Sequence, residues 1–260
     1  MKVLQRHPVL SSSSRMRGSI HLVLALFLAF FFLACSDDDS DFAVRPSDGS
    51  SSSVKEIAAN SSSSRNDKSS SSSEYKRVPC NVEKDENCMK DERDGQTYRT
   101  VKIGEQVWMA ENLNYETPDS YCYNESAEYC EKYGRLYLWS AATTACTQGW
   151  HLPSKDEWNT LFNAVGDSST AGTKLKSTSG WSSNGNGTDV FSFSALPAGY
   201  RYNNEIYDGK GDGTVFWSST ENGSSRTYGM NLRRDDGNAY LDYYSKYTAF
   251  SVRCIKDSPE

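Results

Sequence analysis

The sequence contains little histidine and none of the short motifs that hold a metal ion or a catalytic nucleophile. Of its three histidines, only His151 lies beyond the first 35 residues. It stands just before a predicted helix, which favours a packing role over acid–base catalysis. No CxxC pair, HExxH, GxSxG or phosphate-binding loop is present. We therefore predict no metal and no cofactor, and an enzyme would depend on carboxylates such as Glu221 or Asp235.

Concentrated positive charge is absent as well. The net charge is −6 at pH 7. The basic clusters are short, such as Lys174 with Lys176 and Arg233 with Arg234. A nucleic-acid site needs several cations that face the phosphates together. The sequence therefore predicts no nucleic-acid partner, and a solvated surface explains the short clusters.

Long hydrophobic stretches are missing except for one, at residues 20–34. This run is too short to cross a bilayer comfortably. Arg15 and Arg17 precede it and Cys35 follows it, an arrangement that is typical of a secretion signal. Residues 1–35 are therefore predicted to be a signal peptide.

Cys35 is the predicted lipidation site, because the residues FLAC at the end of the run resemble a lipobox. Phe32 departs mildly from the usual pattern, which prefers leucine three residues before the cysteine. Two or three acyl chains on one residue give stable membrane anchoring. We expect an outer-membrane lipoprotein whose translation starts at Met1 or Met16.

Acidic and serine-rich residues follow Cys35. Residues 36–41 resemble the surface-export signal of outer-membrane lipoproteins in the Bacteroidetes, and a solvated spacer explains them equally well. Serine runs then dominate residues 47–73, with almost nothing apolar to offset the entropy of ordering. Residues 36–91 are predicted to be a disordered tether. The domain beyond it is expected at the cell surface or facing the periplasm.

Six cysteines remain beyond Cys35. An even number in an exported chain indicates disulfides, and six cysteines allow fifteen pairings. The spacing favours two short loops of equal size, Cys80–Cys88 and Cys122–Cys130, which leaves Cys146–Cys254. The folded domain is predicted to span residues 92–257.

Local patterns predict helices and strands in this domain. Residues 97–109 are expected to form a hairpin around Gly104, because glycine first in a two-residue loop suits a type II′ turn. Ser154 and Glu157 form a capping box before an amphipathic helix. A shorter helix is expected around residues 139–142.

Beyond residue 166 the chain changes to short strands and polar loops. Residues 208–213 are too rich in glycine to predict regular structure. The expected strands are at residues 191–193, 215–218, 227–232, 239–243 and 250–255. Two helices followed by a run of strands indicate the α+β class.

Five motifs occur in the order of a known bacterial family. They are WMAENLNY (108–115), GRLYLWSAA (134–142), CTQGWHLPSKDEW (146–158), FWSSTE (216–221) and FSVRCIKD (250–257). Together they resemble the Fibrobacter succinogenes major paralogous domain over nearly all of residues 92–257. The resemblance implies a C-type-lectin-like fold, related to that of formylglycine-generating enzymes. Such a fold has two short helices, a twisted antiparallel sheet, long loops and a disulfide to the last strand.

The resemblance implies no activity that can be carried over. Calcium-dependent lectins use an EPN or QPD triplet with WND, whereas this chain has WSS at residues 217–219. Lys210 stands where a calcium loop around Asp208 and Asp212 would need an oxygen ligand. Cys254 has no neighbouring cysteine for the copper chemistry of formylglycine-generating enzymes. We therefore expect binding that needs no calcium.

The predicted ligand site lies on loops rich in glycine and aromatic residues, since such loops commonly carry binding residues on a rigid scaffold. Its candidate residues are Asp208, Asp212, Trp217, Glu221, Tyr240, Tyr243 and Tyr244. We expect a binding module for a carbohydrate, such as a polysaccharide, or for a cell-surface protein. The alternative is an enzyme of the formylglycine-generating or glycan-processing type.

Overall fold

The computed structural model describes residues 77–258. The predicted signal peptide, the lipidation site Cys35 and the serine runs lie outside the described residues. Within residues 77–258 no helix is long and apolar enough to cross a membrane. The described fold is mixed α+β, as predicted.

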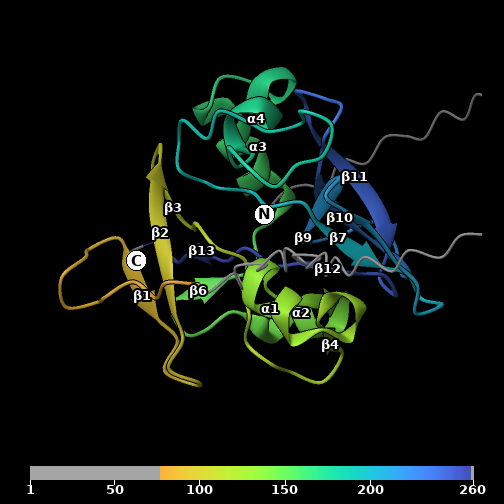
Figure 1. The fold of residues 1–260 in the computed structure, drawn as a ribbon, viewed down its shortest axis with the longest axis horizontal. Coiled ribbons are helices and arrows are strands. Elements are labelled where there is room, and N and C mark those ends of the chain that lie inside the picture. Colours follow the sequence, from red (N-terminus) through yellow and green to blue (C-terminus); the bar gives the residue numbers. More distant parts are fainter. Residues whose placement is uncertain (1–76, 259–260) are drawn as a thin grey trace, which may run out of the picture. The chain divides into compact units, whose positions relative to one another are not determined.

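The described residues contain four α-helices, where the sequence predicts two. Figure 1 shows α3 and α4 on one side of the central strands and α1 and α2 on the other. The helices are α1 (Ala127–Tyr133), α2 (Trp139–Ala145), α3 (Lys155–Ala164) and α4 (Ser168–Leu175), preceded by a 3₁₀ turn, η1 (Tyr123–Glu125).

α2 and α3 are the two helices that the sequence predicts, and α3 has the clearer local signal. In α3 the Ser154 hydroxyl accepts the Glu157 backbone N–H at 3.2 Å, and the Glu157 carboxylate accepts the Ser154 N–H at 2.7 Å. The sequence does not predict α1 or α4. α4 is capped by Asp167 and buries only Ala171, Gly172 and Leu175. So few buried residues leave almost no apolar periodicity to detect.

The strands form two sheets. The smaller has the order β1 (Cys88–Lys90), β2 (Thr97–Ile103), β3 (Gln106–Met109), β13 (Ile255–Lys256) and β6 (Trp150–His151). The larger has the order β11 (Ala239–Ser245), β10 (Arg226–Arg233), β9 (Gly213–Glu221), β7 (Ala198–Arg201), β12 (Ala249–Ser251), β5 (Leu136–Leu138) and β4 (Ser120–Tyr121). One further strand, β8 (Tyr207–Lys210), pairs with β7.

The strand predicted at residues 250–255 is divided between the two sheets. β12 pairs with β5, β7 and β9 in the larger sheet. β13 lies between β3 and β6 in the smaller sheet. Val252, Arg253 and Cys254 carry the chain from one sheet to the other and are completely buried or nearly so. This crossing joins the two sheets.

Two other local predictions are wrong. Residues 208–213 take part in strands β8 and β9, because backbone pairing with β7 compensates for their glycine content. Gly209, at φ +75°, adopts a conformation that other residues rarely reach. Phe193 is fully buried but lies outside any strand.

The folded domain begins before the predicted boundary at residue 92. β1 pairs antiparallel with β2, and the Arg77 guanidinium lies 3.0 Å from Glu111 Oε1. Both side chains of this ion pair are largely buried. Residues 77–91 therefore belong to the domain and not to the predicted tether, 36–91.

Three disulfides hold the described residues, and they are the pairs that the cysteine spacing favours: Cys80–Cys88, Cys122–Cys130 and Cys146–Cys254. The last connects the end of α2 to the crossing between the sheets.

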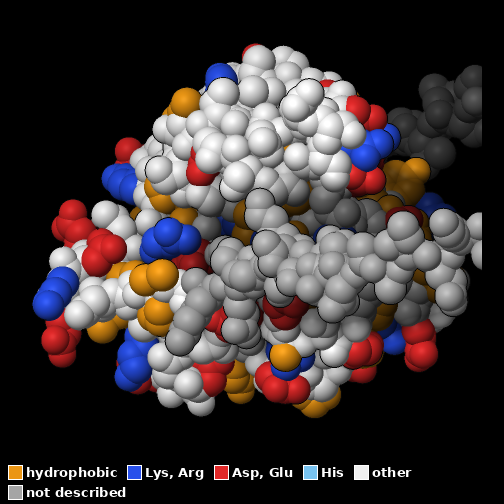
Figure 2. All heavy atoms as spheres, in the orientation of Figure 1, with side chains coloured by type: hydrophobic (Ala, Val, Ile, Leu, Met, Phe, Trp, Pro, Cys, Tyr) orange, Lys and Arg blue, Asp and Glu red, His pale blue; other side chains and the backbone are white. Residues whose placement is uncertain are grey.

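The core is aromatic: Trp108 and Trp158 lie 4.6 Å apart between ring centroids, with Phe193 and Phe216 against them. On the face drawn in Figure 2, acidic and basic side chains are interspersed.

Candidate functional site

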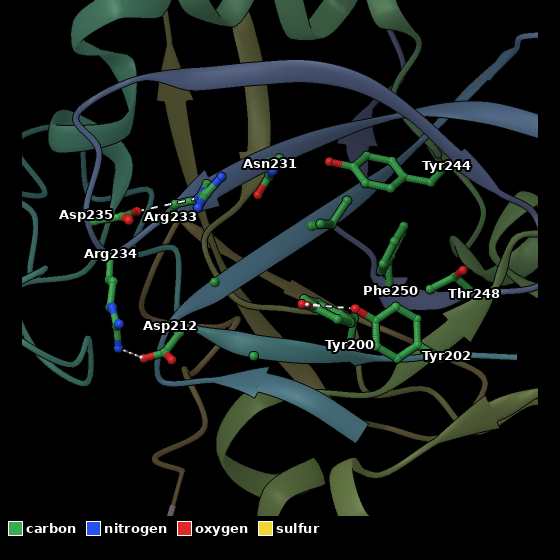
Figure 3. Close-up of a pocket in the computed structure, with 13 residues that line it drawn as sticks. Tyr200, Tyr202, Asp212, Asn231, Arg233, Arg234, Asp235, Tyr244, Thr248 and Phe250 are labelled. Atoms are coloured by element: carbon green, nitrogen blue, oxygen red, sulfur yellow. Dashed lines mark hydrogen bonds and ion pairs between the residues drawn. The ribbon is translucent and has the colours of Figure 1, made fainter. Parts of the chain in front are cut away.

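A groove of about 450 Å³ lies where β7, β9, β10, β11 and β12 approach one another. Its volume is within the range of about 300–1,000 Å³ that is usual for small-molecule sites. Figure 3 shows that its two ends differ in chemistry. Aromatic rings gather at one end, and two arginine–aspartate pairs lie at the other.

The aromatic end is built from Tyr200, Tyr202, Tyr244 and Phe250. Tyr200 packs edge-on against Tyr202, with ring centroids 5.1 Å apart, and Tyr244 does the same against Phe250 at 5.0 Å. Tyr202 remains 40% exposed. The cluster therefore exposes ring surface to a ligand, and packing between the rings holds that surface in place.

Two glycines allow these rings to lie close to the backbone. A Cβ at Gly209 would be 2.7 Å from Cε1 of Tyr200. A Cβ at Gly229 would be 2.9 Å from Cγ1 of Val215 and 3.1 Å from Cδ2 of Tyr244. Neither position could hold a larger residue without moving its neighbours. Gly209 in β8 and Gly229 in β10 therefore determine where the rings of Tyr200 and Tyr244 lie.

The Tyr200 and Tyr244 hydroxyls at this end remain protonated at neutral pH. Burial raises the pKa of Tyr200, and the hydrogen bond between the Tyr200 and Tyr202 hydroxyls adds to the effect. Burial likewise raises the pKa of Tyr244. Neutral phenols both donate and accept hydrogen bonds.

The ionic end lies around the turns that follow β8 and β10. Arg234 Nη1 is 2.6 Å from Asp212 Oδ1, and the Arg234 N–H donates to the Asp212 carbonyl at 2.8 Å. Arg233 Nε lies 3.5 Å from Asp235 Oδ1. Asn231 adds an amide between these pairs and the rings, as Figure 3 shows.

Two of the seven predicted ligand residues, Asp212 and Tyr244, line this groove. Asp208 is exposed beside it, with Oδ2 3.5 Å from the Tyr200 hydroxyl. The other predicted residues do not line the groove. Glu221 forms an ion pair with Lys246 at 2.6 Å.

Two predicted tyrosines lie elsewhere on β11. The Tyr240 hydroxyl contacts the Asp236 carboxylate and accepts a hydrogen bond from the Asn238 amide at 2.8 Å. Tyr243 is 52% exposed and pairs with Tyr228 across the sheet. Its position in the alternation of β11 places it on the sheet face opposite to that of Tyr244.

Trp217 is not a surface residue, in contrast to the prediction. It is fully buried, and its indole N–H donates to the Tyr137 carbonyl at 2.7 Å. β9 lies inside the larger sheet and is buried over Thr214–Ser218 on both faces. An aromatic residue in such a strand packs in the core.

Sequence reasoning missed the arginines, because a pair of adjacent charges usually indicates a solvated surface. The alternation of apolar and polar residues in β10 is the signal that could have indicated Arg233. Met230 and Leu232 are buried on one face, so Gly229, Asn231 and Arg233 share the other face, which forms the groove.

His151 does not line the groove. His151 Nδ1 is 2.6 Å from Asp257 and Nε2 is 2.8 Å from Glu157. Burial alone would lower the pKa of His151, but these two hydrogen bonds outweigh it and raise the pKa. The histidine thus connects the start of α3 to the C-terminal segment.

Among residues 77–258, no group of three or more His, Cys, Asp or Glu side chains could hold a metal ion.

A family model described as the Fibrobacter succinogenes major domain matches residues 101–256. No curated protein and no solved structure matches the chain.

Proposed function

Since the chain belongs to the Fibrobacter succinogenes major domain family, we propose that it is an exported lipoprotein that displays a binding module for carbohydrate. The module is of the C-type-lectin-like type and binds without calcium. Anchored through Cys35 in the outer membrane, it faces the cell surface or the periplasm. The groove between the aromatic and ionic ends is the binding site.

The observation that carries this proposal is the pairing of exposed ring surface with hydrogen-bonding groups in one groove. A sugar ring has an apolar C–H face and a rim of hydroxyls. Tyr202 and Tyr244 suit the first, and Asn231, Arg234 and Asp212 suit the second. Paired strands of the larger sheet position these groups, which limits the ordering cost of binding.

Replacing Tyr202 or Tyr244 by alanine is expected to weaken carbohydrate binding by about 1–3 kcal/mol, or roughly 5- to 150-fold in Kd. Each change removes ring surface from the groove. Screening the full-length chain, purified in detergent, on an array of cell-wall polysaccharides would identify a binder, and calorimetry would measure the loss. Tyr243→Ala, on the opposite sheet face, is the matched control and should leave Kd unchanged. Equal losses for Tyr243 and Tyr244 would contradict the site.

Cys35→Ala is expected to move the protein from the membrane fraction to the soluble fraction, because the acyl chains supply the anchoring. Fractionation of cells labelled with palmitate measures both the location and the lipid. A Cys35→Ala protein that still carries label and sediments with membranes would show that the anchor lies elsewhere.

A further inference from the structure

The charges in the groove cancel. Two arginines face two aspartates, and each arginine is paired: Arg234 with Asp212 at 2.6 Å, and Arg233 with Asp235 at 3.5 Å. All four side chains remain between 39% and 63% exposed. The ionic end is therefore polar and accessible to a ligand, but it carries no net charge.

Each pair has unused hydrogen-bonding capacity. A guanidinium has five N–H donors and a carboxylate about four lone-pair sites. Arg234 and Asp212 contact each other once through their side chains and once through their backbones. The pair therefore presents donors and acceptors side by side. Two neighbouring hydroxyls can accept from the guanidinium and donate to the carboxylate at the same time.

We infer that the ligand of this groove is an uncharged glycan with adjacent free hydroxyls. This inference rests on the proposed function. A uronate or sulfated sugar would bring its negative charge close to Asp212 and Asp235, and an amino sugar would bring its positive charge close to Arg233 and Arg234. Either ligand would add an uncompensated charge to a groove whose charges already cancel, and the like-charged member of each pair would repel it. A neutral diol binds without disturbing the pairs.

The two ends of the groove are arranged for one ligand to use both. Tyr200 and Tyr244 are fixed over Gly209 and Gly229, so the ring surface is preformed. Figure 3 shows Asn231 on the same side as Tyr244, toward the ionic pairs. A sugar that stacks on the rings at one end can thus place the hydroxyls of its neighbour against Arg234 and Asp212.

The test compares ligands that differ in charge, using the full-length chain in detergent. The probes are cellohexaose, mannohexaose and xylohexaose (neutral), hexagalacturonate (anionic) and chitosan hexamer (cationic), each titrated by calorimetry at about 20 mM and about 500 mM NaCl. We expect a neutral probe to bind, with Kd changing by less than about twofold between the two salt concentrations, because no net charge is screened. The charged probes should bind at least about tenfold more weakly.

Variants place the neutral ligand at the ionic end. Asp212→Asn and Arg234→Gln keep the shape but disrupt the donor–acceptor pair, and each should weaken the neutral probe by about fivefold or more. Arg226→Gln is the matched control: Arg226 is exposed on β10 and does not line the groove, so Kd should not change. The salt comparison on the unaltered chain needs no variant and therefore does not depend on how the variants fold.

Each other outcome overturns a specific claim. If hexagalacturonate or chitosan binds most tightly and weakens steeply with salt, the ligand is charged; this inference fails and the proposed function stands. If no probe and no polysaccharide on the array binds at about 1 mM, the proposed function itself fails. If Arg226→Gln weakens binding as much as Arg234→Gln does, the ligand does not occupy the ionic end.

Discussion

Replacing Arg253 with leucine is expected to lower the free energy of unfolding by about 3–5 kcal/mol. The guanidinium is fully buried in the crossing between the sheets. It donates to the Asn112 side chain and to the backbone carbonyls of Met109, Phe193 and Ser194. Leucine would leave these acceptors without a donor, at about 1–3 kcal/mol for each one that stays unsatisfied. Urea unfolding followed by circular dichroism would measure the change.

Two further variants make this test specific. Burial lowers the pKa of Arg253 to about 9, so the side chain still carries its charge at pH 7. Arg253→Lys keeps a cation but has three donors in place of five, and it should recover only part of the loss. Arg226→Leu removes an exposed arginine and should change stability by no more than about 0.5 kcal/mol. A loss below about 1 kcal/mol for Arg253→Leu would show that the acceptors find other partners.

Removing the Cys146–Cys254 disulfide by a double alanine substitution is expected to cost about 4.7 kcal/mol in the chain-entropy model. The bridge closes a loop with a sequence separation of 108 residues. In the unfolded chain, loss of that constraint restores a large conformational freedom. Thermal and urea unfolding of the oxidised protein would measure the difference.

The matched comparison is the Cys122–Cys130 bridge, whose sequence separation is 8. The same relation gives about 2.5 kcal/mol for its removal. The long-range bridge should therefore matter more, by about 2 kcal/mol. Equal losses for the two bridges would mean that native-state contacts, rather than loop length, determine what the bridges contribute. Non-reducing peptide mapping would first establish that both bridges are present in the purified protein.

The features that the sequence predicts correctly are those encoded by neighbouring residues. The capping box of Ser154 and Glu157 satisfies backbone groups within one turn, so it identifies α3 without tertiary information. Gly104, at φ +61°, determines the hairpin between β2 and β3 in the same local way. The short disulfide loops follow from spacing alone, since partners eight residues apart are always close in the chain.

The features that the sequence does not predict depend on what packs against them. Residues 250–255 alternate like one strand, but the first half pairs in one sheet and the second half in the other. Trp217 looks like an exposed aromatic until the neighbours of β9 are known. The groove can be predicted only in part. The sequence indicates Asp212 and Tyr244 as ligand residues. It does not indicate Arg234, because the role of Arg234 depends on its pairing with Asp212, 22 positions earlier.

The position of the crossing between the sheets also determines the order in which the chain can fold. β12 and β13 are interior strands of their sheets, yet they follow every strand that they pair with along the chain. Until they emerge, β5 and β7 in one sheet and β3 and β6 in the other lack the strand that lies between them. The core thus cannot close around a partly synthesised chain. Folding of the domain is therefore completed only when residues 249–256 are available to both sheets.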